Sequence, residues 1–479
     1  MKRRINVIIR KNVTKNKDKL RDQTAAVSFG NGNGNGNGCG AVDHYLDQVC
    51  SHIAARELHA EIRSELAAHM EDRIEEDLQA GYARAEAETR AIAQMGDPGA
   101  VGKELNKAHR PRMPWRLLGA VLLLAAISLL GMGSLQAGGF PSGNAFLPLQ
   151  RQSIFTLLGA GLMLAGYYFD YRRFLKGSWW LYGAALFGIA FVGRYGLMVN
   201  GERSRWVMLP FSFSVDVVAL STYVFAIAVA GIFMEEKAGG RLGNGRNMLK
   251  EAGIIFIPLP FYVLAGGLPE LAVYLASVLL LYAWMSGKWL RTAGAVALTA
   301  AAGIPYVWSH DQMRARILGA VDYNINPDSS GFVYKMLHET IQSAGWWGHG
   351  FGTAADKLVY PYADMLPAYM VHIFGWTGGL ALIGAVLLLC AILRSVHRAV
   401  RDPYGQALIL ALSMVLAAQM IYGLSVLSGK MIIASLPFPF LSYGGHVLFE
   451  YAALGLMMGI YRRKDIIPAA SRLAPGSRA

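Results

Sequence analysis

The sequence predicts an all-α protein in which a small helical module precedes a polytopic membrane bundle of about ten transmembrane helices. Of its 479 residues, 54% are hydrophobic and only 16% are charged, whereas soluble domains carry roughly 25% charged residues. The charge is uneven, because acidic and basic residues are concentrated in residues 1–114 and long apolar runs follow. These observations exclude a disordered chain and a single soluble domain.

The amino-terminal part divides into a leader and a helical module. Residues 1–40 are basic and then rich in Gly and Asn, which predicts a disordered leader. No sustained apolar stretch follows the basic start, so no cleavable signal peptide is expected. Residues 41–110 place apolar residues at three- and four-residue spacing, with Gly81 as a helix stop and Gly96-Asp97-Pro98 as a turn. This module resembles the helical prefix domain of bacterial permease-like proteins, which implies protein contacts or regulation.

Residues 115–465 form the predicted membrane domain. Ten apolar segments approach the roughly 20 residues that cross a bilayer. Pro258, Pro260 and Gly266-Gly267 interrupt the fifth and sixth segments. The predicted spans are 115–135, 153–170, 178–198, 214–234, 252–267, 270–287, 291–308, 367–393, 405–428 and 444–461.

The distribution of basic residues orients these spans. With the amino terminus inside, Lys and Arg gather in the cytoplasmic loops and in the tail 466–479, as the positive-inside rule requires. Both termini are therefore predicted to be cytoplasmic, and the net charge of +13 needs no nucleic acid as a partner. Residues 309–366 then lie outside, where Trp346 and Trp347 favour a structured loop. Three cysteines are too few for a disulfide framework or a zinc site.

Three polar stretches border the predicted outer face: 200–213, 329–379 and 435–445. Glycine pairs and prolines at the ends of spans permit unwound backbone that lines a polar cavity. Alternatively, these glycines and prolines are ordinary loop residues without a functional role.

Together these stretches resemble the SEDS family, typified by FtsW, RodA and SpoVE. The family's LPFxSYGGS signature is matched at residues 439–445, although His446 stands where members usually have serine. Asn200-Gly201 with Arg205-Trp206 matches the family's NGxxRW motif. The glycine-rich segment after Gly331-Phe332 matches a further motif of the family. The matching residues are Pro439, Phe440, Ser442, Tyr443, Gly444 and Gly445, and then Ile341, Ser343, Gly345, Gly348, Gly350 and Gly352.

The resemblance implies a peptidoglycan glycosyltransferase that polymerises lipid II at the outer face of the bacterial cell membrane. It places Asp364, eleven residues before Gly375, on the family's essential acid. His372-Ile373 replaces the paired glutamates that usually follow. Asp364 is otherwise an ordinary loop acid or helix cap, with Asp356 as its nearest competitor. The implied substrate-binding residues are Arg205, Trp206, Ser442, Tyr443, Gly444, Gly445 and Lys357.

The chemistry of the candidate acid leaves two roles open. A carboxylate near the interface accepts the proton of the attacking hydroxyl, or it holds a divalent cation such as Mg²⁺ or Mn²⁺ against the pyrophosphate. No organic cofactor is expected. Arg205 either binds phosphate or extends to the headgroups. Lys357 is able to pair with Asp356 or Asp364.

Departures from the family leave three functions to compare. SVDVVAL replaces the usual QPSE motif and the lysine of span four, so Asp216 is the remaining acid there. The leading hypothesis is a polymerase that acts in division, cell shape or sporulation with a class B penicillin-binding protein and other divisome or elongasome proteins. The alternatives are a flippase for the lipid-linked precursor and a catalytically silent scaffold or regulator.

Overall fold

A computed structural model describes residues 38–54, 59–109, 112–139, 147–196, 198–199, 202–203, 205–209, 213–354 and 358–464. Most of the predicted leader (residues 1–37) and all of the predicted tail lie outside these residues, while residues 38–40 belong to a helix and not to a disordered leader. The chain divides into two compact units, with the boundary between Arg112 and Met113. Each unit is described by itself.

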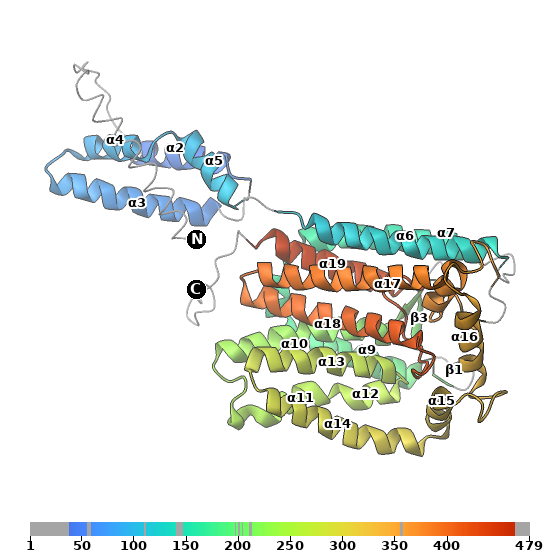
Figure 1. Ribbon diagram of the computed structural model, residues 1–479. Coiled ribbons are helices and arrows are strands. Elements are labelled where there is room, and N and C mark those ends of the chain that lie inside the picture. The colour runs from blue at the N-terminus through green and yellow to red at the C-terminus, as the bar shows by residue number, and fades with distance from the viewer. Residues whose placement is uncertain are drawn as a thin grey trace. The chain divides into compact units, whose positions relative to one another are not determined.

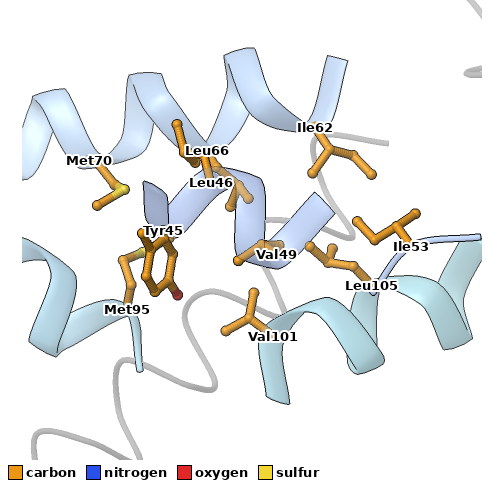
Figure 2. Close-up of a cluster of buried hydrophobic side chains, with 10 residues drawn as sticks. All are labelled: Tyr45, Leu46, Val49, Ile53, Ile62, Leu66, Met70, Met95, Val101 and Leu105. Atoms are coloured by element: carbon orange, nitrogen blue, oxygen red, sulfur yellow. The ribbon is translucent and has the colours of Figure 1, made fainter. Parts of the chain in front are cut away.

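The described residues of the first unit form four helices around one apolar core. Apolar residues at helical spacing face inward, and Ile62, Leu66 and Met70 of one helix are fully buried. Figure 2 shows Leu66 beside Leu46 of a neighbouring helix, in a cluster that also contains Val49, Ile62 and Met70. The helices are α2 (Gly38–Ser51), α3 (His59–Gln79), α4 (Arg84–Met95) and α5 (Pro98–His109).

The predicted turns of this unit are confirmed. Gly81 and Gly96 follow α3 and α4 with φ of 92° and 86°, values that glycine adopts without steric cost. The Asp97 carboxylate accepts the Ala100 amide at 2.7 Å and so caps α5. At Gly102, a Cβ atom would lie 2.8 Å from the carbonyl oxygen of Val49, so glycine allows α5 to approach α2.

The second unit is a bundle of long apolar helices (Figure 1). Its helices are α6 (Trp115–Ala137), α7 (Pro148–Tyr168), α8 (Arg172–Lys176), α9 (Ser178–Tyr195), α10 (Val217–Ala238), η3 (Gly245–Asn247), α11 (Met248–Phe256), α12 (Pro258–Leu264), α13 (Leu268–Ser286), α14 (Trp289–Ser309), α15 (Asp311–Val321), α16 (Phe332–Ser343), α17 (Leu366–Ala399), α18 (Pro403–Val426) and α19 (Val447–Arg462).

The structure confirms the helical membrane bundle, while the count of ten spans stays a prediction. Within the described residues, seven helical segments are long and apolar enough to cross a bilayer. The predicted spans 153–170, 178–198 and 444–461 correspond to α7, α9 and α19, which are not among the seven. The fifth span is broken into α11 and α12, because Pro258 has no amide hydrogen to continue the helix.

Helix contacts run continuously through this bundle. α6 packs on α7 and α17, α17 on α18, α18 on α13, and α13 on α14. α10 contacts α9, α13 and α18, and most of its side chains are buried. Where α7 meets α19, a Cβ atom on Gly455 would lie 2.2 Å from the Met163 carbonyl oxygen. Small residues therefore allow this close crossing, as is common between membrane helices.

The segment between α9 and α10 contains short strands that the helical pattern did not predict. β1 (Met198–Val199) pairs with β2 (Glu202–Arg203), and β3 (Trp206–Leu209) pairs with β4 (Phe213–Asp216), both antiparallel. The register places Trp206 opposite Asp216. The fourth span therefore begins at Val217 and not at residue 214, since residues 213–216 bond to a neighbouring strand.

The described residues of segment 309–366, which the sequence analysis predicts to lie outside, are structured as expected, and they bond to a break in α17. Gly375 interrupts the helix with φ 66° and ψ −166°. The carbonyls of His372 and Ile373 accept the amides of His349 and Gly350 at 2.9 and 3.0 Å. Across the break, the amides of residues 376 and 377 donate to the carbonyls of residues 345 and 346 at 3.0 and 3.2 Å. The loop therefore satisfies the backbone groups that the break leaves open.

Candidate functional site

Asp364 lies in the turn that leads into α17, and its side chain is partly buried. Two residues of the 435–445 segment fix the turn. The Ser442 hydroxyl donates to the Ala363 carbonyl at 2.8 Å, and the Tyr443 amide donates to the Tyr362 carbonyl at 2.9 Å. The two carbonyl groups that precede Asp364 are thus held by the segment that matches the family signature.

The 435–445 segment is itself held by buried polar groups. Ser442 Oγ accepts the Phe438 amide at 2.9 Å, and Ser128 of α6 donates to the Leu441 carbonyl at 2.8 Å. Phe440 has φ 64°, which is uncommon for a residue with a side chain. Its amide donates to Glu450 Oε2 of α19 at 2.6 Å. Helices α6 and α19 therefore hold this irregular backbone in one conformation.

His446 and Glu450 form a buried pair beneath this segment. The His446 Nδ1 atom lies 2.8 Å from Glu450 Oε1, and the two side chains are 10% and 2% exposed. At Gly444, whose φ is 147°, a Cβ atom would lie 2.9 Å from Cδ2 of His446. Glycine at this signature position therefore makes room for the imidazole.

Arg205 pairs with two carboxylates. Its Nε donates to Asp216 Oδ2 at 2.8 Å, and its Nη2 donates to Glu270 Oε1. Asp216 also caps α10 by accepting the Ala219 amide at 2.9 Å, while Glu270 lies in the first turn of α13 and is fully buried. Burial opposes the charge of Arg205, but the two carboxylates raise the pKa of its guanidinium. The guanidinium therefore connects the β3–β4 hairpin to α10 and α13.

Sequence reasoning missed Glu270. The signal that could have found it was an acid in the first turn of an apolar span, where an ionisable side chain requires a partner.

The electrostatics of Asp364 favour a proton acceptor near neutral pH. Burial raises the pKa of its carboxyl to about 6, while His446 and Arg205 act in the opposite direction. An unperturbed aspartate has a pKa of roughly 3.9. A general base works best when its pKa lies near the operating pH.

The remaining candidates have different surroundings. Trp206 is 48% exposed at the start of β3. Gly445 lies in the turn that enters α19, where its carbonyl accepts the Leu448 amide at 3.2 Å. Lys357 and Asp356 lie outside the described residues. The structure thus brings Ser442 and Tyr443 to the turn of Asp364 from a distant part of the sequence, whereas Arg205 contacts Asp216 and Glu270.

The donor set does not form a metal centre of its own. Among the residues that the structure describes, no group of three His, Cys, Asp or Glu side chains is placed to hold a metal ion. Three other described carboxylates are already paired, Asp216 and Glu270 with Arg205 and Glu450 with His446.

Comparisons with known proteins agree on the membrane unit. The model of a family described as cell cycle proteins, named for FtsW, RodA and SpoVE, matches residues 113–466. A probable peptidoglycan glycosyltransferase FtsW of Thioalkalivibrio sp. is 28% identical over 374 residues, covering 74% of this chain and 92% of that protein. One from Halorhodospira halophila is also 28% identical, over 370 residues, covering 72% and 89%.

Two solved structures share the fold. A chain from a peptidoglycan synthase complex that coordinates polymerization and crosslinking aligns with a TM-score of 0.62 and 22% identity, over 73% of this chain and 98% of that one. The rod shape determining protein RodA of Thermus thermophilus aligns with a TM-score of 0.53 and 21% identity, over 72% and 96%.

Proposed function

Because the chain belongs to the family of cell cycle proteins named for FtsW, RodA and SpoVE, we propose that it is a membrane glycosyltransferase that polymerises peptidoglycan strands from lipid II. The process it serves is cell-wall synthesis in division, cell shape or sporulation. The relatives named above as glycosyltransferases support this reaction. The observation that carries the proposal is a single partly buried carboxylate, Asp364, fixed by the segment 435–445.

In the proposed mechanism, Asp364 is the general base. Its carboxylate takes the proton of the acceptor hydroxyl while the hydroxyl oxygen forms a bond to the anomeric carbon of the donor sugar. The bond from that carbon to the lipid pyrophosphate breaks, and the pyrophosphate leaves with the electron pair. General-base assistance of this kind contributes about 10²–10⁴ in rate. Ser442 and Tyr443 position the base through the backbone, Trp206 is proposed to face the substrate, and Arg205 holds the hairpin that carries Trp206.

A divalent cation is compatible with this site only as a companion of the substrate. Mg²⁺ prefers six oxygen ligands and is commonly bound by one or two carboxylates together with substrate phosphates. Among the described residues, Asp364 has no further carboxylate or histidine beside it to complete a resident metal site, so the proposed proton transfer uses the carboxylate alone. Omitting Mg²⁺ and Mn²⁺ from the assay tests whether the pyrophosphate needs one.

The decisive experiment is polymerisation of lipid II by the purified full chain. The wild type is expected to produce glycan polymer, and Asp364→Asn to reduce the initial rate by about 10²-fold or more. Asp328→Asn is the matched control, since Asp328 is an exposed acid of the same outer segment. Loss of activity in both variants, or retention in both, would refute Asp364 as the base.

The broken helix α17 favours a second candidate, a flippase, because discontinuous membrane helices are common in transporters. A flippase would move labelled lipid II across proteoliposomes without forming polymer. The candidate polar groups, however, gather around the turn that precedes α17 and around the signature segment, where α17 and α19 begin. Polymer formation would therefore decide between the two.

The topology and the partner belong to the same proposal. We place both termini in the cytoplasm, because the basic loops require it. A class B penicillin-binding protein is the proposed crosslinking partner, supported by the fold shared with a chain of a peptidoglycan synthase complex. Terminal tags tested for protease protection in sealed spheroplasts should remain protected at both ends. Stimulation of polymerisation by the co-purified transpeptidase would support the partnership.

A further inference from the structure

The loop between α10 and α11 meets the turn between α13 and α14 at one end of the membrane unit. The Nη1 atom of Arg291 donates to the Gly243 carbonyl at 2.8 Å. At Gly243, whose φ is 76°, a Cβ atom would lie 3.2 Å from Cβ of Ser286 and 3.4 Å from Cγ of Lys288. Both connections join helical segments that are long and apolar enough to cross a bilayer. The two connections therefore belong to the same membrane surface.

Two buried glutamates fix the loop between α10 and α11. Glu251 is 3% exposed and accepts the Gly243 amide at 2.6 Å. Glu236 is 5% exposed and pairs with Arg241 at 3.1 Å and with Lys250 at 2.6 Å. Hydrogen bonds to ionised groups are stronger than those between neutral groups. These contacts therefore hold the loop in one conformation and use part of its positive charge.

Positive charge remains after these glutamates are paired. Residues 235–251 and 286–291 contain six basic and three acidic residues. Arg246 of the loop and Lys288 of the turn are exposed, and neither forms an ion pair with a residue that the structure describes. We call these two residues the basic patch. Its two cations come from the two connections that meet at Gly243.

Exposed tryptophans indicate the depth of this surface in the bilayer. Lys250 Nζ lies 5.8 Å from the ring centre of Trp179, and Lys237 Nζ lies 5.9 Å from that of Trp284. Trp289, the first residue of α14, is 59% exposed. Tryptophan side chains are enriched at the level of the lipid headgroups. The basic patch is therefore expected at the level of the lipid phosphates.

Apolar side chains adjoin the basic patch in the sequence and are open to the surroundings. Leu249 and Leu290, in the first turns of α11 and α14, are 86% and 90% exposed. Only 6% of the apolar stretch of α14 is buried within the protein. Exposed cations followed by exposed leucines match a ligand with an anionic head and acyl chains.

We propose that the basic patch binds the phosphate of an anionic phospholipid in the inner leaflet. The acyl chains of this lipid lie against Leu249 and Leu290. The guanidinium of Arg246 suits a phosphate because it donates two parallel hydrogen bonds, and Lys288 adds a point charge. The site requires no polymerisation of lipid II, so it goes beyond the proposed function. Only the choice of leaflet rests on the proposed topology.

The size of the effect follows from the two cations. A lysine or arginine near an anionic membrane surface strengthens binding by roughly fivefold. Removing both cations should therefore weaken the binding of an anionic lipid by about 25-fold. A zwitterionic lipid carries a positive group of its own beside the phosphate, so it should gain little from the patch.

The test measures lipid binding to the purified full chain in neutral detergent. Phosphatidylglycerol or phosphatidylcholine is titrated in, and bound lipid is counted by native mass spectrometry. The variant Arg246→Gln with Lys288→Gln removes the patch. The control, Arg394→Gln with Arg398→Gln, removes the same charge from exposed positions near the end of α17. Inorganic phosphate is added as a competitor at the lipid concentration, because a site for free anions would not need acyl chains.

The wild type is expected to bind phosphatidylglycerol at least tenfold more tightly than phosphatidylcholine. The patch variant should lose about 25-fold in affinity for phosphatidylglycerol, and the control should stay within about twofold of the wild type. Equal losses in the two variants would indicate general charge attraction and overturn the site, as would equal affinity for the two lipids or displacement by inorganic phosphate. If the patch variant unfolds, the comparison of the two lipids on the wild type still decides. Failure of polymerisation would refute the proposed function and leave this binding test unaffected.

Discussion

Replacement of Gly375 by alanine tests the junction between α17 and the outer loop. A Cβ atom there would lie 2.3 Å from the carbonyl carbon and oxygen of Trp346, in a backbone conformation that only glycine adopts readily. The conformational strain costs about 1–3 kcal/mol, and the overpacking costs about 1–3 kcal/mol more. The four hydrogen bonds across the junction contribute about 0.5–1.5 kcal/mol each. Because the two totals are similar, the junction should open rather than absorb the strain.

Hydrogen exchange is the appropriate measurement for this variant. The amides of His349, Gly350, Trp376 and Thr377 should lose protection, and polymerisation should fall because α17 begins two residues after the candidate base. Gly384→Ala is the control on the same helix, since nothing lies within 4 Å of its added Cβ. It should leave exchange unchanged or stabilise the helix by about 0.5–1 kcal/mol. Wild-type protection in the Gly375 variant would refute the reasoning.

Three further changes address the site. Arg205→Gln leaves the fully buried Glu270 unpaired and should lower the folding stability by about 3–5 kcal/mol. Thermal unfolding in detergent measures this loss, and adding Glu270→Gln should restore most of the stability. Ser442→Ala leaves the Ala363 carbonyl and the Phe438 amide without their hydrogen-bond partner, which destabilises the fold by about 1–3 kcal/mol for each group. For polymerisation, kcat should fall more than KM rises. An unchanged kcat would contradict the positioning role of Ser442. Because the folded pKa of Asp364 is raised to about 6, the folded state binds the proton more tightly than the unfolded state. Stability therefore falls as pH rises from about 4 to 6. Asp364→Asn should accordingly raise the unfolding temperature at pH 8 but not at pH 4. Equal effects at the two pH values would contradict the raised pKa of the Asp364 carboxyl.

Much of the fold follows from the helical spacing of apolar residues and from the positions of glycine and proline. The predicted turns at Gly81 and Gly96 exist because positive φ values favour glycine, and the break before Pro258 exists because proline lacks an amide hydrogen. These are local effects, so the sequence reveals them. The β3–β4 hairpin escaped prediction because its strands are only four residues long and follow an apolar span.

The site was predicted in part. Spacing from Gly375 indicated Asp364, whose catalytic role stays a prediction. The family signature indicated Ser442 and Tyr443 as substrate-binding residues, and their hydrogen bonds to the turn of Asp364 were not predicted. The choice between phosphate binding and headgroup contact for Arg205 did not anticipate its carboxylate partners. Glu270 lies 65 residues away in the sequence, and no local pattern connects the two. Long-range pairing of this kind is decided by helix packing.

The sequence alone determined that most of this chain belongs in a membrane, where its helices turn or break, and which family it resembles, since these follow from local composition and spacing. Tertiary structure alone decided which charges meet. A buried charge is costly unless it is paired with an opposite charge. Helix packing pairs Arg205 with two carboxylates and pairs His446 with Glu450, next to the segment 435–445 that holds the turn of Asp364.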